Sequence, residues 1–266
     1  MTGGRPNGSA VSNARRKGSS ALGRRLGLIQ MRKHRMGECT YCGQVRALTR
    51  DHVPPKCIIP PALRQNLTTV PACDECNHAG GEDDEYFRDR IGMHTSLAGD
   101  PVIAPVRGSM LRSAALPEKR AYALDFLRSF EQSAILAPDG RPYRVFTVAG
   151  DSILRVVIRT TAGIFRRYWG HRVPDGYQVR AQFGRHLDFL RNPLLDQYRR
   201  DLLARDPLIE IPGVYNCRAM GSSAEHDFTL WWHEFFGNVT FMAATFRPSS
   251  SVLDASEPPY VDPVNC

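Results

Sequence analysis

Apolar residues recur every three or four positions in three stretches of the second half of the chain. These stretches, residues 117–136, 151–169 and 193–203, are predicted to be amphipathic helices. We expect Asp151 to cap the second helix and Asn192, which precedes a proline, to cap the third. Each helix is expected to bury the side that its apolar residues share.

Four further stretches have the alternating or densely apolar pattern of strands. They comprise residues 143–148, 177–183, 208–220 and 228–246. Inside the last stretch, Gly237-Asn238 predicts a turn. Its aromatic run, Trp231-Trp232-His233-Glu234-Phe235-Phe236, is better explained by the buried and half-buried faces of a strand than by a platform for stacking bases. The mixture of helices and strands predicts an α+β fold.

Residues 36–90 have a different composition. They are dense in Cys, Pro, Asp and His and lack long apolar runs, so they would bury little core and would need a metal ion to hold them. Residues 91–117 contain several glycines and prolines and are predicted to be a loose connection. We therefore predict a basic disordered tail at 1–35, a small module at 36–98 and a larger α+β domain of unassigned fold at 99–266.

The net charge of the 266-residue chain, +8, comes from its N-terminal end. Residues 1–35 contain nine of the 35 Lys and Arg residues and no acid, which leaves 26 basic residues against 27 acidic ones elsewhere. The tail is rich in Gly, Ser and Arg, which predicts disorder, although a basic arm can bind phosphates. A translation start at Met31 or Met36 explains the tail equally well, so the charge says little about nucleic-acid binding.

Four of the seven cysteines form two CxxC pairs, Cys39/Cys42 and Cys73/Cys76. The chain has no secretory signal and no run of eighteen apolar residues, so we expect a cytoplasmic protein without a membrane partner. In that compartment, cysteines separated by two residues indicate metal ligands rather than disulfides. Four thiolates suit a tetrahedral zinc ion. This Zn²⁺ would close a gap of 30 residues, and a loop of that length is expected to contain further chemistry.

Five motifs follow one another in residues 39–87. They are, in order, Cys39-x-x-Cys42, Asp51-His52-Val53-Pro54-Pro55, Asn66, Cys73-Asp74-Glu75-Cys76-Asn77 and Asp83-Asp84-Glu85-Tyr86-Phe87. This pattern resembles an HNH endonuclease of the cysteine-stapled type. It implies the ββα-metal arrangement, in which a two-stranded hairpin and a helix clamp one catalytic metal ion. It also implies that the zinc ion at the four cysteines is structural and joins the two ends of this unit.

By this resemblance, Asp51 and Asn77 hold a catalytic Mg²⁺ or Mn²⁺ through oxygen atoms, which such hard cations prefer. His52 is the general base that takes a proton from the attacking water, and Asn66 fixes the loop that presents its imidazole. Asp51 and His52 are adjacent, so on an extended strand they would point to opposite faces. Both face one site only if the chain bends there, and Pro54-Pro55 favours a bend.

Two positions depart from the family's pattern. The last of its three named residues is often His, where this chain has Asn77, and the Asn version is also common in the family. Many relatives carry a lysine three residues after the position of Asn77, where this chain has Gly80. The task of binding the phosphate would then fall to Arg50, Lys56 or His78.

Two charged runs have ordinary structural interpretations. The acidic run Asp83-Asp84-Glu85 is interpreted as the start of a helix, where it is favourable to the helix dipole, with extra metal contacts as the alternative. The basic residues at helical spacing, Arg155, Arg159, Arg166 and Arg167, are interpreted as a solvated helix face rather than a nucleic-acid groove.

Three hypotheses for function follow. The favoured one is a metal-dependent endonuclease that hydrolyses phosphodiester bonds in nucleic acid, DNA rather than RNA, in restriction or phage defence. A double-strand cut from one site per chain would need a homodimer or two turnovers. The alternative is a non-catalytic zinc module that binds nucleic acid or protein, which the departure at Gly80 favours. A third makes residues 99–266 a ligand-binding sensor, which a polar cleft in that part would support.

Overall fold

The computed structural model describes residues 35–94, 99–136, 142–146, 148–187, 191–221 and 228–248. They belong to one compact unit, His34–Cys266. They combine helices with sheets, which confirms the α+β class. The predicted basic tail, apart from Arg35, lies outside the described residues. None of the described helices is both long and apolar enough to cross a membrane.

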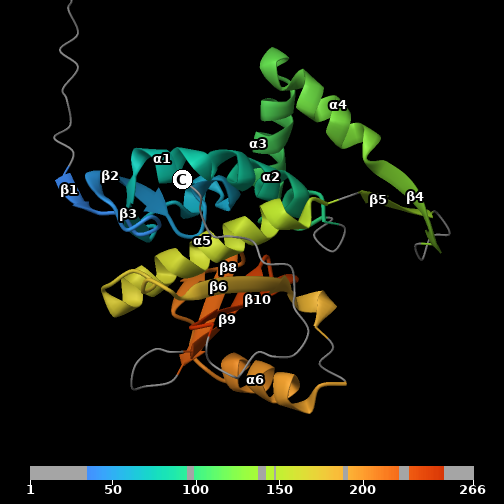
Figure 1. The fold of residues 1–266 in the computed structure, drawn as a ribbon. Helices are drawn as coiled ribbons and strands as arrows, with labels where there is room; N and C mark the ends of the chain where they lie inside the picture. The colour runs from blue at the N-terminus through green and yellow to red at the C-terminus, as the bar shows by residue number, and fades with distance from the viewer. Residues whose placement is uncertain are drawn as a thin grey trace, which may run out of the picture. The chain divides into compact units, whose positions relative to one another are not determined.

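The four paired cysteines lie in residues 35–92, which we call the cysteine-rich segment. Its strands form an antiparallel sheet in the order β1-β2-β3, and two helices follow at once (Figure 1). The elements are β1 Arg35–Glu38, β2 Val45–His52, β3 Thr69–Cys73, α1 Asp74–Ala79 and α2 Gly81–Gly92. Between β2 and β3 the chain forms two short 3₁₀ helices, Lys56–Ile58 and Pro61–Leu63, and each follows a proline that fixes its entry.

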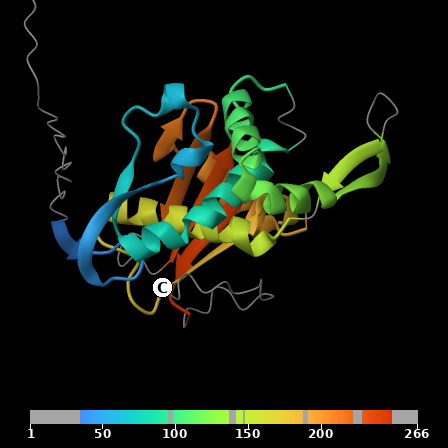
Figure 2. The same ribbon diagram turned by 90° about the horizontal axis from the view of Figure 1, so that it is seen from above.

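The middle of the chain forms two helices and a hairpin, which extend to one side in Figures 1 and 2. The elements are α3 Ala104–Ala114, the 3₁₀ helix Pro117–Lys119, α4 Arg120–Arg128, β4 Phe130–Leu136 and β5 Pro142–Phe146. The predicted loose connection at 91–117 is therefore wrong, because most of it is helical. The single helix predicted over 117–136 is wrong in its second half, which is strand.

An aromatic cluster accounts for this error. Phe126 and Phe130 are four residues apart, as on one helix face, but the helix ends at Arg128. Phe130 begins β4, where it pairs with Phe146 across the hairpin and lies 5.3 Å from it between ring centroids. Phe126 packs on both rings at 5.0 and 5.8 Å. Packing between distant residues thus outweighs the local helical pattern.

A five-stranded antiparallel sheet occupies the C-terminal half, in the order β6-β10-β9-β8-β7. The strands are β6 Gln178–Phe183, β7 Ile209–Ile211, β8 Tyr215–Gly221, β9 Phe228–Phe235 and β10 Val239–Phe246. The turn predicted at Gly237-Asn238 is confirmed, with Gly237 in the left-handed region at φ 69°. The single strand predicted over 208–220 is a hairpin instead, because the chain turns at Gly213, where φ is 71°.

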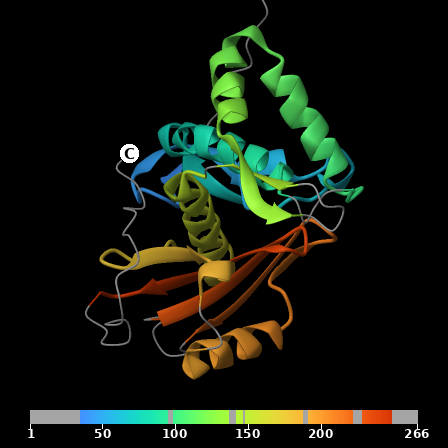
Figure 3. The same cartoon turned by 90° about the vertical axis from the view of Figure 1, so that its right-hand side faces the viewer.

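Two helices cover opposite faces of this sheet (Figures 1 and 3). On one face, α6 Pro193–Leu203 buries Leu202 against Trp232 and Met242. Its predicted cap is confirmed, because the Asn192 side chain accepts a hydrogen bond from Leu195 N at 3.0 Å. On the other face lies α5 Gly150–Trp169. The cap predicted there is wrong, since Ala149 precedes the helix and Asp151 lies in its first turn.

The core is continuous from the cysteine-rich segment to the sheet. Phe87 on α2 packs edge-on against Phe235 of β9, with ring centroids 5.0 Å apart. Gly163 of α5 lies so close to Val53 that a Cβ atom there would be 2.4 Å from Val53 Cγ1. Buried residues on both sides of the boundary predicted near residue 99 therefore belong to one cluster. The aromatic run of β9 is confirmed as strand core, with Trp231 and Phe235 fully buried.

His233 of β9 is fully buried, and burial lowers its pKa to about 3. The Thr161 hydroxyl donates to Val157 O, so it accepts from His233 Nε2 at 2.9 Å, and Tyr215 OH donates to Nδ1 at 2.8 Å. The neutral ring is thus fully hydrogen-bonded. Between pH 6.5 and 3 the unfolded chain binds a proton here that the folded chain does not, so stability falls as pH falls.

We predict that the titration of His233 lowers the free energy of unfolding by about 2 kcal/mol between pH 7 and pH 5. Urea denaturation at the two pH values, of the wild type and His233→Gln, measures the difference. The variant is expected to lose less stability on acidification, whatever its stability at pH 7. An equal loss in both proteins would contradict the assignment.

Candidate functional site

The four paired cysteines form a cluster that can hold a metal ion. Their sulfur atoms all lie within 4.8 Å of one another, and three of the four side chains are buried. The Sγ atoms of Cys42 and Cys73 are 3.8 Å apart. A tetrahedral ion with bonds of about 2.3 Å to sulfur needs an edge of about 3.8 Å. The cluster therefore fits zinc, as the sequence predicts.

Local backbone geometry prepares the first pair. Gly43 N donates to Cys39 O at 3.1 Å, and Gly43 has a φ of 71°, so the chain turns tightly around the pair. Tyr41 N and Cys73 N point at Cys39 Sγ, at 3.4 and 3.3 Å. Burial alone raises the pKa of Cys39, but these N–H donors outweigh it and lower the pKa below its ordinary value. The thiolate that a metal ion needs is thereby favoured.

Asp51 lies on β2 in a polar cluster that the sequence does not reveal. The carboxylate is mostly buried, and its Oδ2 accepts from Tyr41 OH at 2.5 Å and from Arg159 Nη2 of α5 at 2.8 Å. Arg159 also pairs with Asp84 of α2 at 3.5 Å. We call Tyr41, Asp51, Asp84 and Arg159 the acidic cluster. It joins the cysteine-rich segment to α5 by ion pairs.

Gly80 makes room for this arginine. A Cβ atom at residue 80 would lie 1.1 Å from Arg159 Nη1. Gly80 has a φ of −78°, so its backbone alone does not require glycine. The guanidinium of Arg159 therefore lies where a side chain at residue 80 would begin. This position has no room for the lysine that the HNH resemblance implies there.

The basic residues of α5 do not form the solvated face that their spacing predicts. Arg155 makes a two-pronged ion pair with Asp83, at 2.7 Å for each bond, and Arg166 pairs with Glu38 at 2.9 Å. With Arg159, three of the four positions bind acids of the cysteine-rich segment, and only Arg167 is exposed. These partners are 72 to 128 residues away in the chain, so helical spacing gave no sign of them.

Asp83 and Asp84 lie in the first turn of α2, which confirms the predicted helix start. Their carboxylates have a second role as partners of α5. Burial raises the pKa of Asp84 to about 7, against the lowering effect of Arg159 and with smaller contributions from Asp51 and Asp83. The acidic cluster therefore holds two closely spaced carboxyl groups and a single arginine.

Asn77 reaches the same face of β2 as Asp51. Its amide Nδ2 donates to Thr49 Oγ1 at 2.9 Å, and Thr49 in turn donates to Ala72 O of β3 at 3.0 Å. Thr49 and Asp51 are two residues apart on β2 and so share a face. The fold thus brings the two predicted ligands of the catalytic metal ion to one side of the β2–β3 pair, beside the cysteine cluster.

His52 follows Asp51 without the bend that one shared face requires. β2 continues through His52, which pairs with Thr69 of β3, so the two side chains point to opposite faces. His52 is half-buried, and burial and the charge of Lys56 lower its pKa. Its role as a base remains a prediction.

The remaining predicted site residues lie on the surface. Asn66 is exposed in the turn before β3, in the left-handed region at φ 57°, a conformation that asparagine tolerates well. Arg50, Lys56 and His78 are exposed, and His78 Nδ1 lies 3.3 Å from Asp74 Oδ1. Asn66 thus has a clear conformational role, and phosphate binding by the others stays a prediction.

Sequence reasoning missed Tyr41 and Arg159 as members of the site. The one available signal was Gly80, where a long side chain was expected and none is present. Comparisons of the chain with protein-family models, curated proteins and solved structures find no match in any of the three.

We predict one zinc ion per chain. Metal analysis of purified protein is expected to give about one equivalent for the wild type and far less for Cys39→Ser, because one of four tetrahedral ligands is lost. Cys57→Ser is the matched control, since Cys57 lies outside the cluster and its thiol donates to Asp84 O. Zinc loss from both variants, or from neither, would contradict a four-cysteine site.

We also predict that alanine substitutions at two neighbouring glycines change the free energy of unfolding by different amounts. Gly80→Ala displaces Arg159 from its two carboxylates and is expected to cost about 1 to 3 kcal/mol of unfolding free energy. Gly81→Ala is expected to cost nothing, because a Cβ atom there meets no atom within 4 Å. In an Arg159→Ala background the cost of Gly80→Ala should disappear. Urea denaturation measures the wild type, the three single variants and the double variant, and a cost of Gly80→Ala that persists in the Arg159→Ala background would show that Arg159 is not the obstacle.

Proposed function

We propose that this protein is a metal-dependent endonuclease of the HNH type that hydrolyses phosphodiester bonds, with DNA as the favoured substrate. The observation that supports the proposal is that Asn77, through its bond to Thr49, lies on the face of β2 that carries Asp51, next to a four-cysteine cluster. The order of strand, strand and helix from β2 to α1 agrees with the hairpin-and-helix unit that the resemblance implies.

The donor atoms suit one hard divalent cation. Asp51 Oδ2 is bound by Tyr41 and Arg159, which leaves Oδ1 for a cation, and Asn77 turns its amide nitrogen toward Thr49, which leaves its oxygen. A carboxylate and an amide oxygen are typical ligands of Mg²⁺ or Mn²⁺. Such an ion supplies positive charge to the phosphate and its leaving oxygen.

The chain's own residues supply the rest. His52 would accept the proton of the attacking water at a ring nitrogen, and its lowered pKa favours the neutral ring that this role needs. Because His52 points to the face of β2 opposite Asp51, the role requires the chain to bend at His52 when substrate binds. Tyr41 and Arg159 hold the Asp51 carboxylate in one orientation. We assign to Arg159 the positive charge that many HNH relatives supply from a lysine at the position of Gly80. Arg50 and Lys56, exposed near His52, would bind the backbone of the substrate.

The proposed site also has consequences for the cellular compartment and for the number of chains that act together. Four cysteines that bind zinc must stay reduced, which favours the cytoplasm. Each chain offers one site, so a double-strand cut requires two chains or two turnovers. Restriction or phage defence would use either.

Cleavage of supercoiled plasmid tests the proposal. With Mg²⁺ or Mn²⁺, we expect the wild type to nick the plasmid, chelator to stop it, and His52→Ala to be about 10² to 10⁴ times slower. His171→Ala is the matched control, because His171 is an exposed histidine in the turn after α5, where its ring Nδ1 donates to Arg172 O. Full nicking activity in His52→Ala would show that His52 is not the general base.

One observation favours the alternative, a non-catalytic zinc module that binds nucleic acid or protein. Asp51 is mostly buried and already paired with Arg159, whose charge opposes a cation at the same carboxylate. Folded, zinc-loaded wild type that binds plasmid without nicking it, with either metal ion, would support this module and reject the nuclease.

A further inference from the structure

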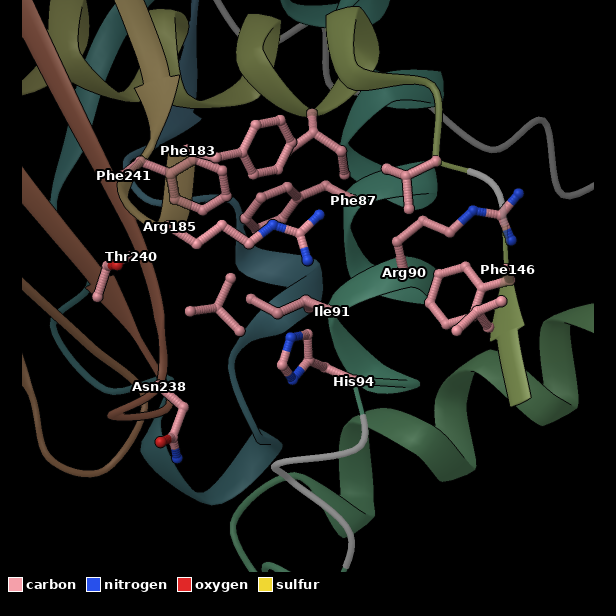
Figure 4. A pocket seen from close by; sticks show the side chains of 14 residues that line it. Phe87, Arg90, Ile91, His94, Phe146, Phe183, Arg185, Asn238, Thr240 and Phe241 are labelled. Carbon is pink, nitrogen blue, oxygen red and sulfur yellow. The ribbon is translucent and has the colours of Figure 1, made fainter. Parts of the chain in front are cut away.

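A cavity of about 380 Å³ lies between α2, β5 and the β6–β10 edge of the sheet (Figure 4). Three packed aromatic rings form one side of its wall: Phe241 lies 5.1 Å from Phe183 and 6.1 Å from Phe87 between ring centroids. None of the described lining residues belongs to the cysteine cluster or the acidic cluster. The cavity is a second site, with the size of an ordinary small-molecule pocket.

The polar groups of this cavity are cationic or neutral. Arg185 lies on the 3₁₀ helix Gly184–His186 and is exposed. Its guanidinium extends over the ring of Phe183 toward Ile91 and His94 (Figure 4). Asn238 and Thr240 add neutral hydrogen-bonding groups. No acidic residue occurs among the described residues that line the cavity. An anion is therefore attracted to it.

Arg90 adds a second positive charge to the lining of the cavity. It is about nine-tenths buried in the wall, and its Nε and Nη1 atoms have no hydrogen-bond acceptor among the described residues. The guanidinium lies over the rings of Tyr86 and Phe126, at 4.5 and 4.1 Å, which partly stabilise its charge. A buried guanidinium with unpaired N–H groups is costly, and an anionic ligand nearby would reduce that cost.

We propose that this cavity binds a small aromatic anion, a flat ring carrying one carboxylate or phosphate group. The ring would stack on the phenylalanine wall, and the anionic group would pair with Arg185, with Arg90 adding a longer-range attraction. The proposal does not depend on the nuclease site. It also supports the sensor hypothesis in a specific form, because the pocket is aromatic and basic rather than merely polar.

Calorimetric titration with two matched pairs of probes tests the ligand class. Adenosine 5′-monophosphate is compared with adenosine, and 1-naphthoate with 1-naphthalenemethanol, in buffer without added Mg²⁺ or Mn²⁺. At least one anion is expected to bind about tenfold more tightly than its neutral partner. The pair that shows the difference tells whether the ligand is a nucleotide or another aromatic acid. Equal binding within both pairs, or no binding up to about 1 mM, overturns the proposal.

Three variants locate the binding. Arg185→Gln is expected to weaken the preferred anion about tenfold and leave the neutral probe unchanged. Arg180→Gln, which removes the same charge from β6 outside the cavity lining, is the matched control and should bind as the wild type does. Val145→Trp, at an exposed position of β5, should fill the mouth and abolish binding of both probes. Unchanged anion binding in both Arg185→Gln and Val145→Trp would place the site elsewhere and reject the proposal.

Discussion

Arg159 reaches from the middle of α5 to two carboxylates on different elements, Asp51 of β2 and Asp84 of α2. Removing this arginine would leave two mostly buried carboxyl groups without their shared cation, a change that typically costs about 3 to 5 kcal/mol. Since α5 also packs on the five-stranded sheet, Arg159 couples the cysteine-rich segment to the remainder of the fold, together with the ion pairs of Arg155 and Arg166. The absence of a side chain at Gly80 is a condition of that contact.

The cysteine cluster is a second constraint on the cysteine-rich segment. Cys39 and Cys42 lie in the turn between β1 and β2, whereas Cys73 ends β3 and Cys76 lies in α1. A zinc ion shared by them would fix α1 against the sheet, and Asn77 follows Cys76 directly. The hydrogen bond from Asn77 to Thr49 therefore depends on the cluster. Arg159 orients the carboxylate and the cluster orients the amide, so two independent constraints converge on one face of β2.

Local signals in the sequence were sufficient for some features and not for others. The two CxxC pairs, the cap at Asn192 and the turn at Gly237 depend on neighbouring residues, and the structure agrees with each. The strand beginning at Phe130 depends on Phe146, and the inward direction of Arg155 and Arg159 depends on acids more than 70 residues away. A single sequence contains no sign of such pairings, except where a residue such as Gly80 breaks an expected pattern.

Asp51 and Asn77 are proposed to hold a divalent cation on the face of β2 that they share. Electron paramagnetic resonance of Mn²⁺ added to zinc-loaded protein measures this directly, without any substrate. We expect one Mn²⁺ to bind per chain. Its binding should be lost in Asp51→Ala, weakened in Asn77→Ala and retained in Asp74→Ala, which removes an exposed carboxylate of α1. If Asp51→Ala binds Mn²⁺ as the wild type does, or if the wild type binds none, the claim is contradicted.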